Sequence, residues 1–526
     1  MLFRNRQLEL IGLALRCTCK MVLETSTRAA ATSAVAFTVS KTQQKQASPT
    51  NQQIQFPLVD NYENAVKALN SLQSNYSVLR NRIRSDTFHI EETVKFLQRI
   101  GIGLEKLDTL PVIHISGTKG KGSTCCLVDS ILRTHGYKTG FFSSPHLVSV
   151  TERIRLNGKP IEPSIFSAYF WSVYNKLLSQ RDHAHDLPSY FNFLTILAFD
   201  IFLRENVDVA IVEVGIGGRY DCTNVVRGTK TVGITSLGLE HTRLLGSRIE
   251  DIAWQKAGII KPQSNVFTVR QPDGCLDVIE AECERLEAEL HVVPDFDSYR
   301  WQRKPNLSGN NLALKLNTSL AIQIALNWIG HTRGREKNHI LSELVTKGVE
   351  SCFWPGRCHQ IRKGNKRIFL DGAHTVESIE ICAKWFQSCQ RKKNPKILIF
   401  NATGDRDNNK LLKLLAKHVH FDKVFFSPNL ASNKITNVDS INLNFPNDEQ
   451  MKRCVENHQL WGDIMRQQNT PGSKAHVHTA LESVFEQIDN NYSEQQECDI
   501  LVTGSLHLIG AVLTALKMES QVTSLG

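Results

Sequence analysis

The sequence lacks the features that mark a secreted, metal-finger or membrane-spanning protein. Its 13 cysteines include no C-x-x-C pair and no zinc-finger spacing, which predicts reduced thiols in an intracellular protein and no zinc site. The longest apolar run of the N-terminal region, Leu10 to Leu15, is far shorter than the ~20 residues needed to cross a bilayer, so no transmembrane helix is expected. No internal repeat of fixed period is present.

A strongly basic surface is also missing, although the formal charge is +10. Residues 1–50 hold seven Lys or Arg against two Glu, and this difference of five is half of the excess. The other half, spread over the rest of the chain, fits anionic small substrates at least as well as a polynucleotide, so no nucleic-acid partner is expected. With 526 residues, the chain is long enough for two or three domains.

Residues 1–55 have the composition of a mitochondrial transit peptide. Arg4, Arg6, Arg16 and Arg28 lie among Ala, Ser, Thr and Leu, acidic residues are few, and no globular pattern is present. Met21 offers a second start that would remove half of this leader, so we expect a form in the mitochondrial matrix and hypothesise a cytosolic one. A disordered tail without a targeting role is the alternative.

The segment from His114 to Thr124 predicts a loop that binds nucleotide phosphates. An apolar run precedes it and apolar residues at helical spacing follow it, which indicates the order strand, loop, helix. Gly117, Gly120 and Gly122 let backbone N–H groups face an anion at the positive end of a helix dipole.

Two side chains of this loop have the chemistry of a triphosphate site. Lys121 can reach terminal phosphates, and the hydroxyl of Ser123 is placed to hold Mg²⁺. The strict pattern G-x-x-x-x-G-K-[ST] is not met, because Ile115 replaces its first Gly and Gly122 separates Lys121 from Ser123. A tight turn with an exposed lysine is therefore the alternative.

Three further polar residues follow predicted strands, and we expect them at the same edge of the sheet. Ser144 follows a strand at 138–142, Glu213 lies near the end of a β-branched run at 207–214, and His241 follows a strand at 231–236. We favour Mg²⁺ over a structural ion pair as the partner of Glu213, because a buried carboxylate beside a phosphate loop needs a cation. A turn serine and a hydrogen-bonded structural histidine are the alternatives for Ser144 and His241.

Residues 351–526 predict a second, smaller α/β domain after a first domain at 56–350. A turn at 354–357 presents Arg357, and a strand at 367–370 ends in Asp371-Gly-Ala-His374. Further strands are expected at 396–400, 424–426 and 500–503, with a polar, partly mobile insertion at about 432–474. The predicted fold class is α/β, with a mostly parallel sheet carrying the phosphate loop and helices on both faces, plus this second domain.

Seven segments in one order resemble the eukaryotic type of folylpolyglutamate synthase, in the Mur-ligase-like superfamily of ATP-dependent amide ligases. That superfamily uses the shortened form of the phosphate loop, and the resemblance runs from about residue 60 to the C-terminus apart from the insertion. The segments are Gly117–Thr124, Phe141–Leu147, Val212–Gly218, Tyr220–Asn224, Asp371–His374, Asn401–Asp407 and Val502–Leu508.

The resemblance implies a role for each candidate site residue. Magnesium would be held by Ser123, Ser144, Glu213 and His241, with a monovalent cation as a further option. Lys256, which chemistry alone identifies only as a surface or phosphate-contacting lysine, would be carbamylated by CO₂. His374 would lie near the transferred phosphate, and Glu240 departs from the usual Asp. ATP would be bound by Gly117, Thr118, Gly120, Lys121, Gly122, Ser123, Arg357 and Asp371.

The implied activity is the ATP-dependent addition of L-glutamate, in γ-linkage, to the glutamate tails of reduced folates. An acyl phosphate would form and ADP and phosphate would be released, with Lys121, Lys256 and His374 as catalytic residues in a monomer. The product would keep folates in the cell and in mitochondria for one-carbon metabolism.

Three other functions are the alternatives. The leader and the eukaryotic-type segments argue against a peptidoglycan-type amino-acid ligase, and the second domain argues against a P-loop kinase. A nucleotide-binding regulator without catalysis is disfavoured because Lys121, Glu213, His241 and Lys256 are all present.

Overall fold

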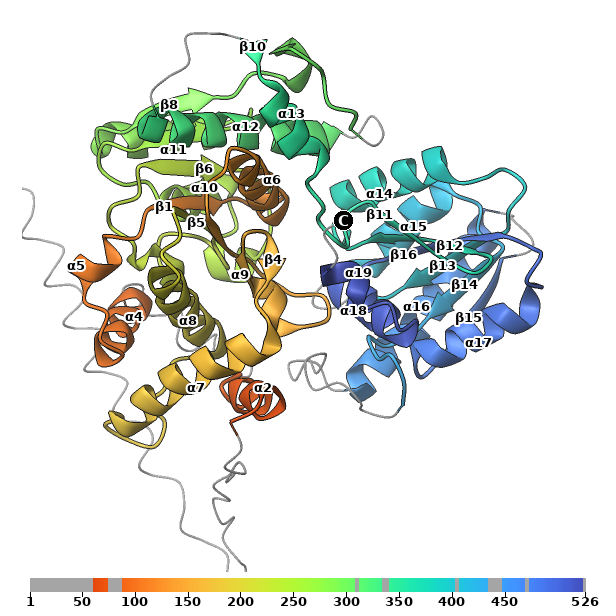
Figure 1. Cartoon of the computed structure of the whole chain (residues 1–526). Coiled ribbons are helices and arrows are strands. Elements are labelled where there is room, and N and C mark those ends of the chain that lie inside the picture. Colours follow the sequence, from red (N-terminus) through yellow and green to blue (C-terminus); the bar gives the residue numbers. More distant parts are fainter. Residues whose placement is uncertain are drawn as a thin grey trace, which may run out of the picture. The chain divides into compact units, whose positions relative to one another are not determined.

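Two large sheets, each covered by helices, organise the protein (Figure 1). The computed structural model describes residues 60–73, 88–307, 312–333, 340–402, 406–433, 447–468 and 473–523. The predicted transit peptide therefore lies outside the described residues. In the described part of the chain, no helix has the length and apolar character needed to cross a membrane.

The first sheet has eight strands in the order β4-β3-β2-β5-β1-β6-β7-β8. The six strands from β2 to β8 in this order pair in parallel, and β3 and β4 add an antiparallel edge. The strands are β1 (Val112–Ser116), β2 (Thr139–Phe142), β3 (Ile154–Leu156), β4 (Lys159–Pro160), β5 (Val209–Glu213), β6 (Thr231–Ile234), β7 (Asn265–Thr268) and β8 (Glu289–Val292).

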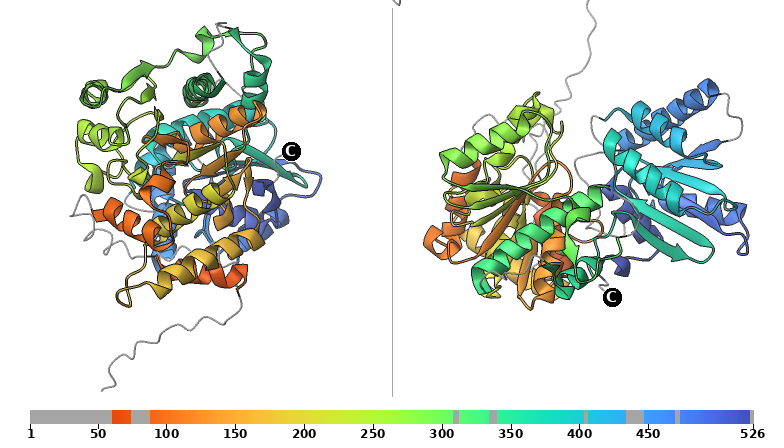
Figure 2. Two further views of the ribbon diagram at one scale, coloured as in Figure 1. Left: turned by 60° about the vertical axis from the view of Figure 1, so that its left-hand side comes forward. Right: turned by 90° about the horizontal axis from the view of Figure 1, so that it is seen from above.

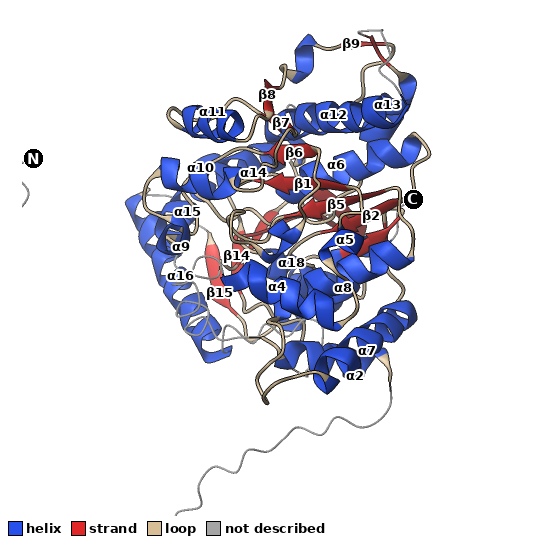
Figure 3. Cartoon of the chain, turned by 90° about the vertical axis from the view of Figure 1, so that its left-hand side faces the viewer, coloured by secondary structure: helices blue, strands red, loops and turns tan. Residues whose placement is uncertain are grey.

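Helices cover both faces of this sheet because its central strands are apolar on both sides (Figure 3). Val209 and Ile211 of β5 pack in the core with α6, α12 and α13, whereas Ala210 and Val212 pack on the opposite face with α2, α4, α7 and α8. The helices are α2 (Tyr62–Ser71), α4 (Phe88–Arg99), α5 (Leu104–Leu107), α6 (Lys121–Thr134), α7 (Pro163–Ser179), α8 (Tyr190–Arg204), α9 (Thr242–Leu245), α10 (Ile249–Ala257), α11 (Cys275–Arg285), α12 (Leu312–Arg333) and α13 (Glu343–Glu350). A separate two-stranded sheet pairs β9 (Arg300–Trp301) with β10 (Ile340–Leu341).

The second sheet has six strands in the order β11-β12-β16-β13-β14-β15. Figure 2 shows the strands and helices of this region in cyan to blue. Its pairs are parallel except for β11 with β12. Its elements are β11 (His359–Lys363), β12 (Lys366–Asp371), α14 (Val376–Cys389), β13 (Lys396–Phe400), α15 (Asn408–His418), β14 (Lys423–Phe426), α16 (Asn447–Gln467), β15 (Lys474–Val477), α17 (Leu481–Asn491), β16 (Cys498–Thr503), α18 (Leu506–Ala515) and α19 (Ser520–Thr523).

The interval 432–474, predicted as a polar and partly mobile insertion of weak periodicity, contains helix α16. Residues 434–446 and 469–472 of this interval lie outside the described residues. The buried residues of α16 recur at spacings of three and four, but Gln450 and Asn457 are polar and so weaken the apolar pattern. Both are hydrogen-bonded, since Gln450 accepts from the N–H of Asn429 at 3.0 Å and Asn457 accepts from Asn408 at 2.9 Å.

Candidate active site

The predicted phosphate loop lies between β1 and α6, at the carboxyl edge of the first sheet. Gly117 has φ +141°, and a Cβ there would lie 1.8 Å from Thr235 Oγ1, so the loop is pressed against the end of β6. Gly120, with φ +92°, precedes α6, whose first turn has no acidic residue and no side-chain cap. The first N–H groups of α6 are thus placed to bind an anion.

Other parts of the loop are fixed by hydrogen bonds or begin the helix. Thr118 donates its N–H to Ser236 O at 3.0 Å and its hydroxyl to Gly238 O at 3.1 Å. Lys121, Gly122 and Ser123 form the first turn of α6 and are half-buried. The order strand, loop, helix expected from the sequence is therefore present.

Two lysines share one acceptor in this loop. Lys121 Nζ lies 3.2 Å from Gly117 O, and Lys256 Nζ, from α10, lies 2.7 Å from the same oxygen. Lys256 is 4% exposed, and burial together with the charge of Lys121 lowers its pKa to about 7. A deprotonated Lys256 or a bound anion would relieve the repulsion between them.

Glu213 lies beside the loop at the end of β5, in register with Ile115 of β1. It is buried, and its Oε2 accepts a hydrogen bond from the N–H of Ser144 at 3.0 Å. A Cβ on Gly122 would lie 3.3 Å from the same oxygen. Burial raises the pKa of Glu213, against the opposing effect of Lys121. The structure thus brings Ser144, Glu213 and the start of α6 together.

The fourth predicted magnesium ligand is His241. It is exposed, has φ +53° and immediately precedes α9 in the segment that follows β6. In the part of the chain that the structure describes, no group of three or more His, Cys, Asp or Glu side chains could hold a metal ion. The proposed set contains one Glu and one His with two serines, so it remains a prediction.

Arg357, which precedes β11, lies close to Asp371 at the end of β12 and to the segment 372–374 that follows this strand. The Asp371 carboxylate accepts from the N–H groups of Cys358 at 2.8 Å and Ala373 at 2.9 Å. Burial raises the pKa of Asp371, against the opposing effect of the Arg357 charge. His374 Nδ1 donates to Gly372 O at 2.8 Å, because a carbonyl oxygen can only accept.

A cluster of Lys119, Glu240 and His374 connects the two sheets, and sequence reasoning missed it. Lys119 Nζ lies 2.9 Å from Glu240 Oε1 and 3.3 Å from His374 Nε2. His374 Nε2 is also 3.3 Å from Glu240 Oε1. The replacement of the usual Asp by the longer Glu240 was the available signal, but its partner is 134 residues away in the chain.

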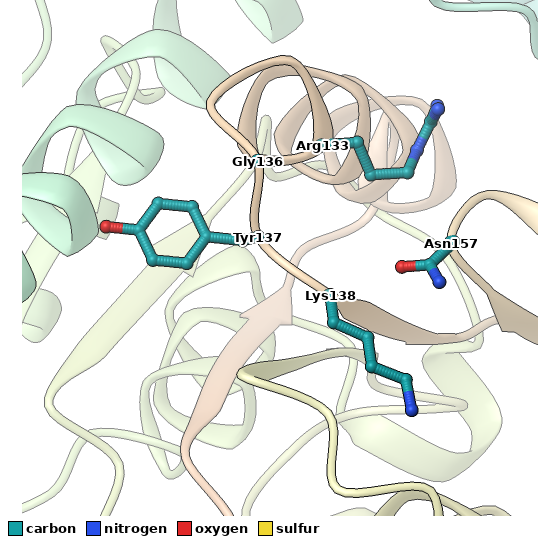
Figure 4. A pocket seen from close by; sticks show the side chains of 5 residues that line it. All are labelled: Arg133, Gly136, Tyr137, Lys138 and Asn157. Atoms are coloured by element: carbon teal, nitrogen blue, oxygen red, sulfur yellow. The ribbon is translucent and has the colours of Figure 1, made fainter.

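A hollow elsewhere on the first sheet lies away from these residues (Figure 4). It is lined by Arg133, Gly136, Tyr137, Lys138 and Asn157, near the end of α6 and the start of β2. Ligands of open α/β sheets bind beyond the carboxyl ends of the strands, whereas this hollow lies at the amino end of β2. We therefore assign the candidate site to the phosphate loop.

Solved structures of similar fold support the architecture. An Escherichia coli FolC structure in complex with DHPP and ADP has a TM-score of 0.65 at 22% identity and covers 88% of this chain and 98% of that chain. Mycobacterium tuberculosis folylpolyglutamate synthase complexed with ADP also has a TM-score of 0.65, at 23% identity, covering 87% and 99%.

Sequence relatives establish the family. Residues 357–515 match the family model described as dihydrofolate synthetase, C-terminal domain. The mitochondrial folylpolyglutamate synthase of Cricetulus griseus is 42% identical over 444 residues, covering 78% of this chain and 75% of that protein. The human protein of the same name is 38% identical over 541 residues, covering 87% and 92%. With this identity along most of its length, the chain belongs to the folylpolyglutamate synthase family.

Proposed function

We propose that this protein is an ADP-forming ligase that adds L-glutamate in γ-linkage to the glutamate tail of reduced folates. The observation that carries the proposal is the contact of Lys119, in the phosphate loop, with His374, in the second sheet region, at 3.3 Å. A small-molecule kinase needs only the phosphate loop and its acceptor. A ligase must also hold an amine against the activated carboxyl group, and a second α/β unit at the loop supplies that surface.

The reaction divides into two steps with different requirements. The terminal carboxylate of folate first attacks the γ-phosphate of ATP, giving an acyl phosphate and ADP. The amine of glutamate then displaces phosphate to form the amide, so the acyl phosphate supplies both driving force and leaving group. Lys121 and the first N–H groups of α6 would stabilise the charge on the transferred phosphoryl group.

Magnesium is proposed to bind Glu213 with the hydroxyls of Ser123 and Ser144, and with His241. Hard oxygen donors suit this ion, and burial raises the pKa of Glu213, so a cation would stabilise its ionised form. When bound, Mg²⁺ would neutralise phosphate charge during transfer. A monovalent cation remains a further prediction.

Lys256 is proposed to be carbamylated. The reaction joins the neutral amine to CO₂ and releases a proton, and a pKa of about 7 leaves a large neutral fraction at physiological pH. Carbamylation would replace the cation beside Lys121 with an anion. The repulsion between the two lysines would then become an attraction.

Residues of the second sheet region are proposed to complete the site. Arg357 and Asp371 would contact ATP when the two α/β units close, and His374 would act near the transferred phosphate. Closure would exclude water, which otherwise hydrolyses an acyl phosphate. We further propose that the protein is a monomer, that residues 1–55 direct it to mitochondria and that a start at Met21 gives a cytosolic form.

The test is ADP release by protein lacking residues 1–55, with Mg²⁺, ATP, tetrahydrofolate and L-glutamate, omitting one component at a time. We expect release that requires both organic substrates, and a folate product heavier by one glutamyl residue. Lys121→Met should abolish release, whereas Lys138→Met, at the other end of the sheet, should not. Release without glutamate would point to a kinase, and no release at all would point to a regulator.

A further inference from the structure

Two cysteine side chains from distant parts of the sequence contact each other near the phosphate loop. Cys126 lies in the first half of α6, and Cys352 follows the end of α13 by two residues. Their Sγ atoms are 3.4 Å apart. Cys126 is 6% exposed and Cys352 is half-buried. The reaction proposed above uses neither thiol.

The packing of α13 against α6 sets this contact. A Cβ on Gly348 would lie 2.7 Å from Ile131 Cα, so the two helices approach closely at that point. One residue nearer the phosphate loop along α6, Ser130 Oγ and Ser351 Oγ are 3.2 Å apart. The two backbones are therefore held together immediately beside the thiols.

Trp354 extends the packing beside the two cysteines to the phosphate loop. Trp354 Cζ2 lies 3.1 Å from the position that a Cβ on Gly122 would occupy. The indole also packs against Phe141, with centroids 5.5 Å apart, and under the guanidinium of Arg155 at 5.3 Å. Arg357 follows Trp354 by three residues, so a shift of Cys352 would reach both the loop and the arginine proposed to contact ATP.

We propose that Cys126 and Cys352 form a site of oxidative modification, at which a peroxide joins them in a reversible disulfide that restrains residues 351–357 and slows turnover. The turnover part rests on the proposed ligase function. A disulfide bond is shorter than the present contact, so the segment after α13 must move toward α6. Residues 351–357 connect α13 of the first α/β unit to β11 of the second, so a restraint on them opposes the closure proposed above.

The oxidation is balanced with one hydrogen peroxide. The more exposed thiol, that of Cys352, is oxidised to a sulfenic acid with release of one water. The sulfur of Cys126 then attacks Cys352 Sγ and displaces the second oxygen as water. Two thiols lose two electrons and two protons in total, and a dithiol reductant such as dithiothreitol reverses the step.

The reduced pair has a hydrogen-bond arrangement that makes the reaction slow at neutral pH. Cys352 donates its S–H to Cys126 Sγ, and Cys126 donates to Phe353 O at 3.5 Å. The contact with Cys126 and burial raise the pKa of the Cys352 thiol well above its ordinary value. The reactive thiolate is thus scarce, so sustained exposure to peroxide is needed and higher pH should accelerate the reaction.

The experiment treats the full chain with hydrogen peroxide, blocks free thiols and digests with trypsin without reduction. Cleavage places Cys126 in peptide 122–133 and Cys352 in peptide 348–357. We expect these two peptides linked and kcat for ADP release lowered severalfold, with both effects reversed by dithiothreitol. Cys352→Ser should show neither effect. Cys125→Ser, which alters the adjacent thiol, and Cys389→Ser, which alters another half-buried thiol, should behave as the unaltered protein.

Several results would overturn the proposal. A dose that oxidises Cys389 without linking the two peptides would eliminate the modification site, as would a link through Cys125. A linked protein with unchanged kcat, or equal inactivation of Cys352→Ser, would eliminate the effect on turnover. The link is located by mass spectrometry, with fragmentation of peptide 122–133 to distinguish Cys126 from Cys125. Failure of the reduced protein to release ADP would therefore count against the proposed function and not against the disulfide.

Discussion

The buried ring of His114 should make folding stability depend on pH. His114 lies in β1, is fully buried, and has Nε2 2.9 Å from Thr223 Oγ1. Thr223 donates its own hydroxyl hydrogen to Asp221 Oδ1 at 2.5 Å, so Nε2 of His114 carries the hydrogen in their shared bond. Nδ1 is then an unprotonated acceptor, buried without a hydrogen-bond partner among the described residues.

The magnitude follows from the difference in proton binding between folded and unfolded chains. Burial and the charge of Lys261 lower the pKa of His114 to about 3, whereas the unfolded value is ~6.5. The unfolded chain therefore binds the extra proton, and stability is lost as the pH falls through 6.5 toward 3. Between pH 7 and pH 5, RT ln[(1 + 10^1.5)/(1 + 10^−0.5)] gives a loss of about 2 kcal/mol.

The assay compares urea unfolding at pH 7 and pH 5 for the unaltered protein and His114→Gln. Glutamine does not titrate and keeps an N–H for Thr223, so the variant should lose about 2 kcal/mol less of its free energy of unfolding. His183→Gln, in an exposed loop, should match the unaltered protein. Other buried histidines titrate in all three proteins and cancel in the comparison. Equal pH dependence in the unaltered protein and His114→Gln would refute the reasoning.

Three further predictions concern the candidate site. Lys256→Ala should lower kcat for ADP release by about 10²-fold, with partial rescue by formate. In the unaltered protein, removal of CO₂ should lower kcat most below pH 7, because less of the Lys256 amine is neutral there. Gly117→Ala should abolish ADP formation and lower the melting temperature because of the clash with Thr235, whereas Gly228→Ala, which meets open space, should change neither. Glu213→Gln should raise the Mg²⁺ concentration for half-maximal ADP release at least about tenfold; an unchanged Mg²⁺ titration would remove Glu213 from the metal site.

Elements with strong local signals were predictable from the sequence. The strand expected at 396–400 is β13 at the same residues, and the β-branched run at 207–214 contains β5. Glycines at Gly117 and Gly120 mark positions where the backbone has positive φ and where neighbouring side chains leave no room for a Cβ. Such features depend on a few adjacent residues, so a short window of sequence contains them.

Contacts between residues far apart in the sequence could not be predicted from such local patterns. Lys119 and His374 are separated by 255 residues, and no periodicity relates them. The contact of Cys126 with Cys352 likewise depends on how α13 packs on α6. The order of the strands is also a property of pairing, so β16, last in the chain, lies between β12 and β13. The resemblance supplied roles for single residues but not these partners.

The positive charges of the candidate site link folding stability to the binding of anions. Lys119 is paired with Glu240, but Lys121 and Lys256 share Gly117 O, and burial lowers the pKa of Lys256 to about 7. The two ammonium groups on one carbonyl repel each other, and burial of the Lys256 cation is unfavourable for folding. A triphosphate beside Lys121 and a carbamate on Lys256 would each add an anion beside these cations. Binding of ATP should therefore raise the melting temperature of the protein, and less so in Lys121→Met.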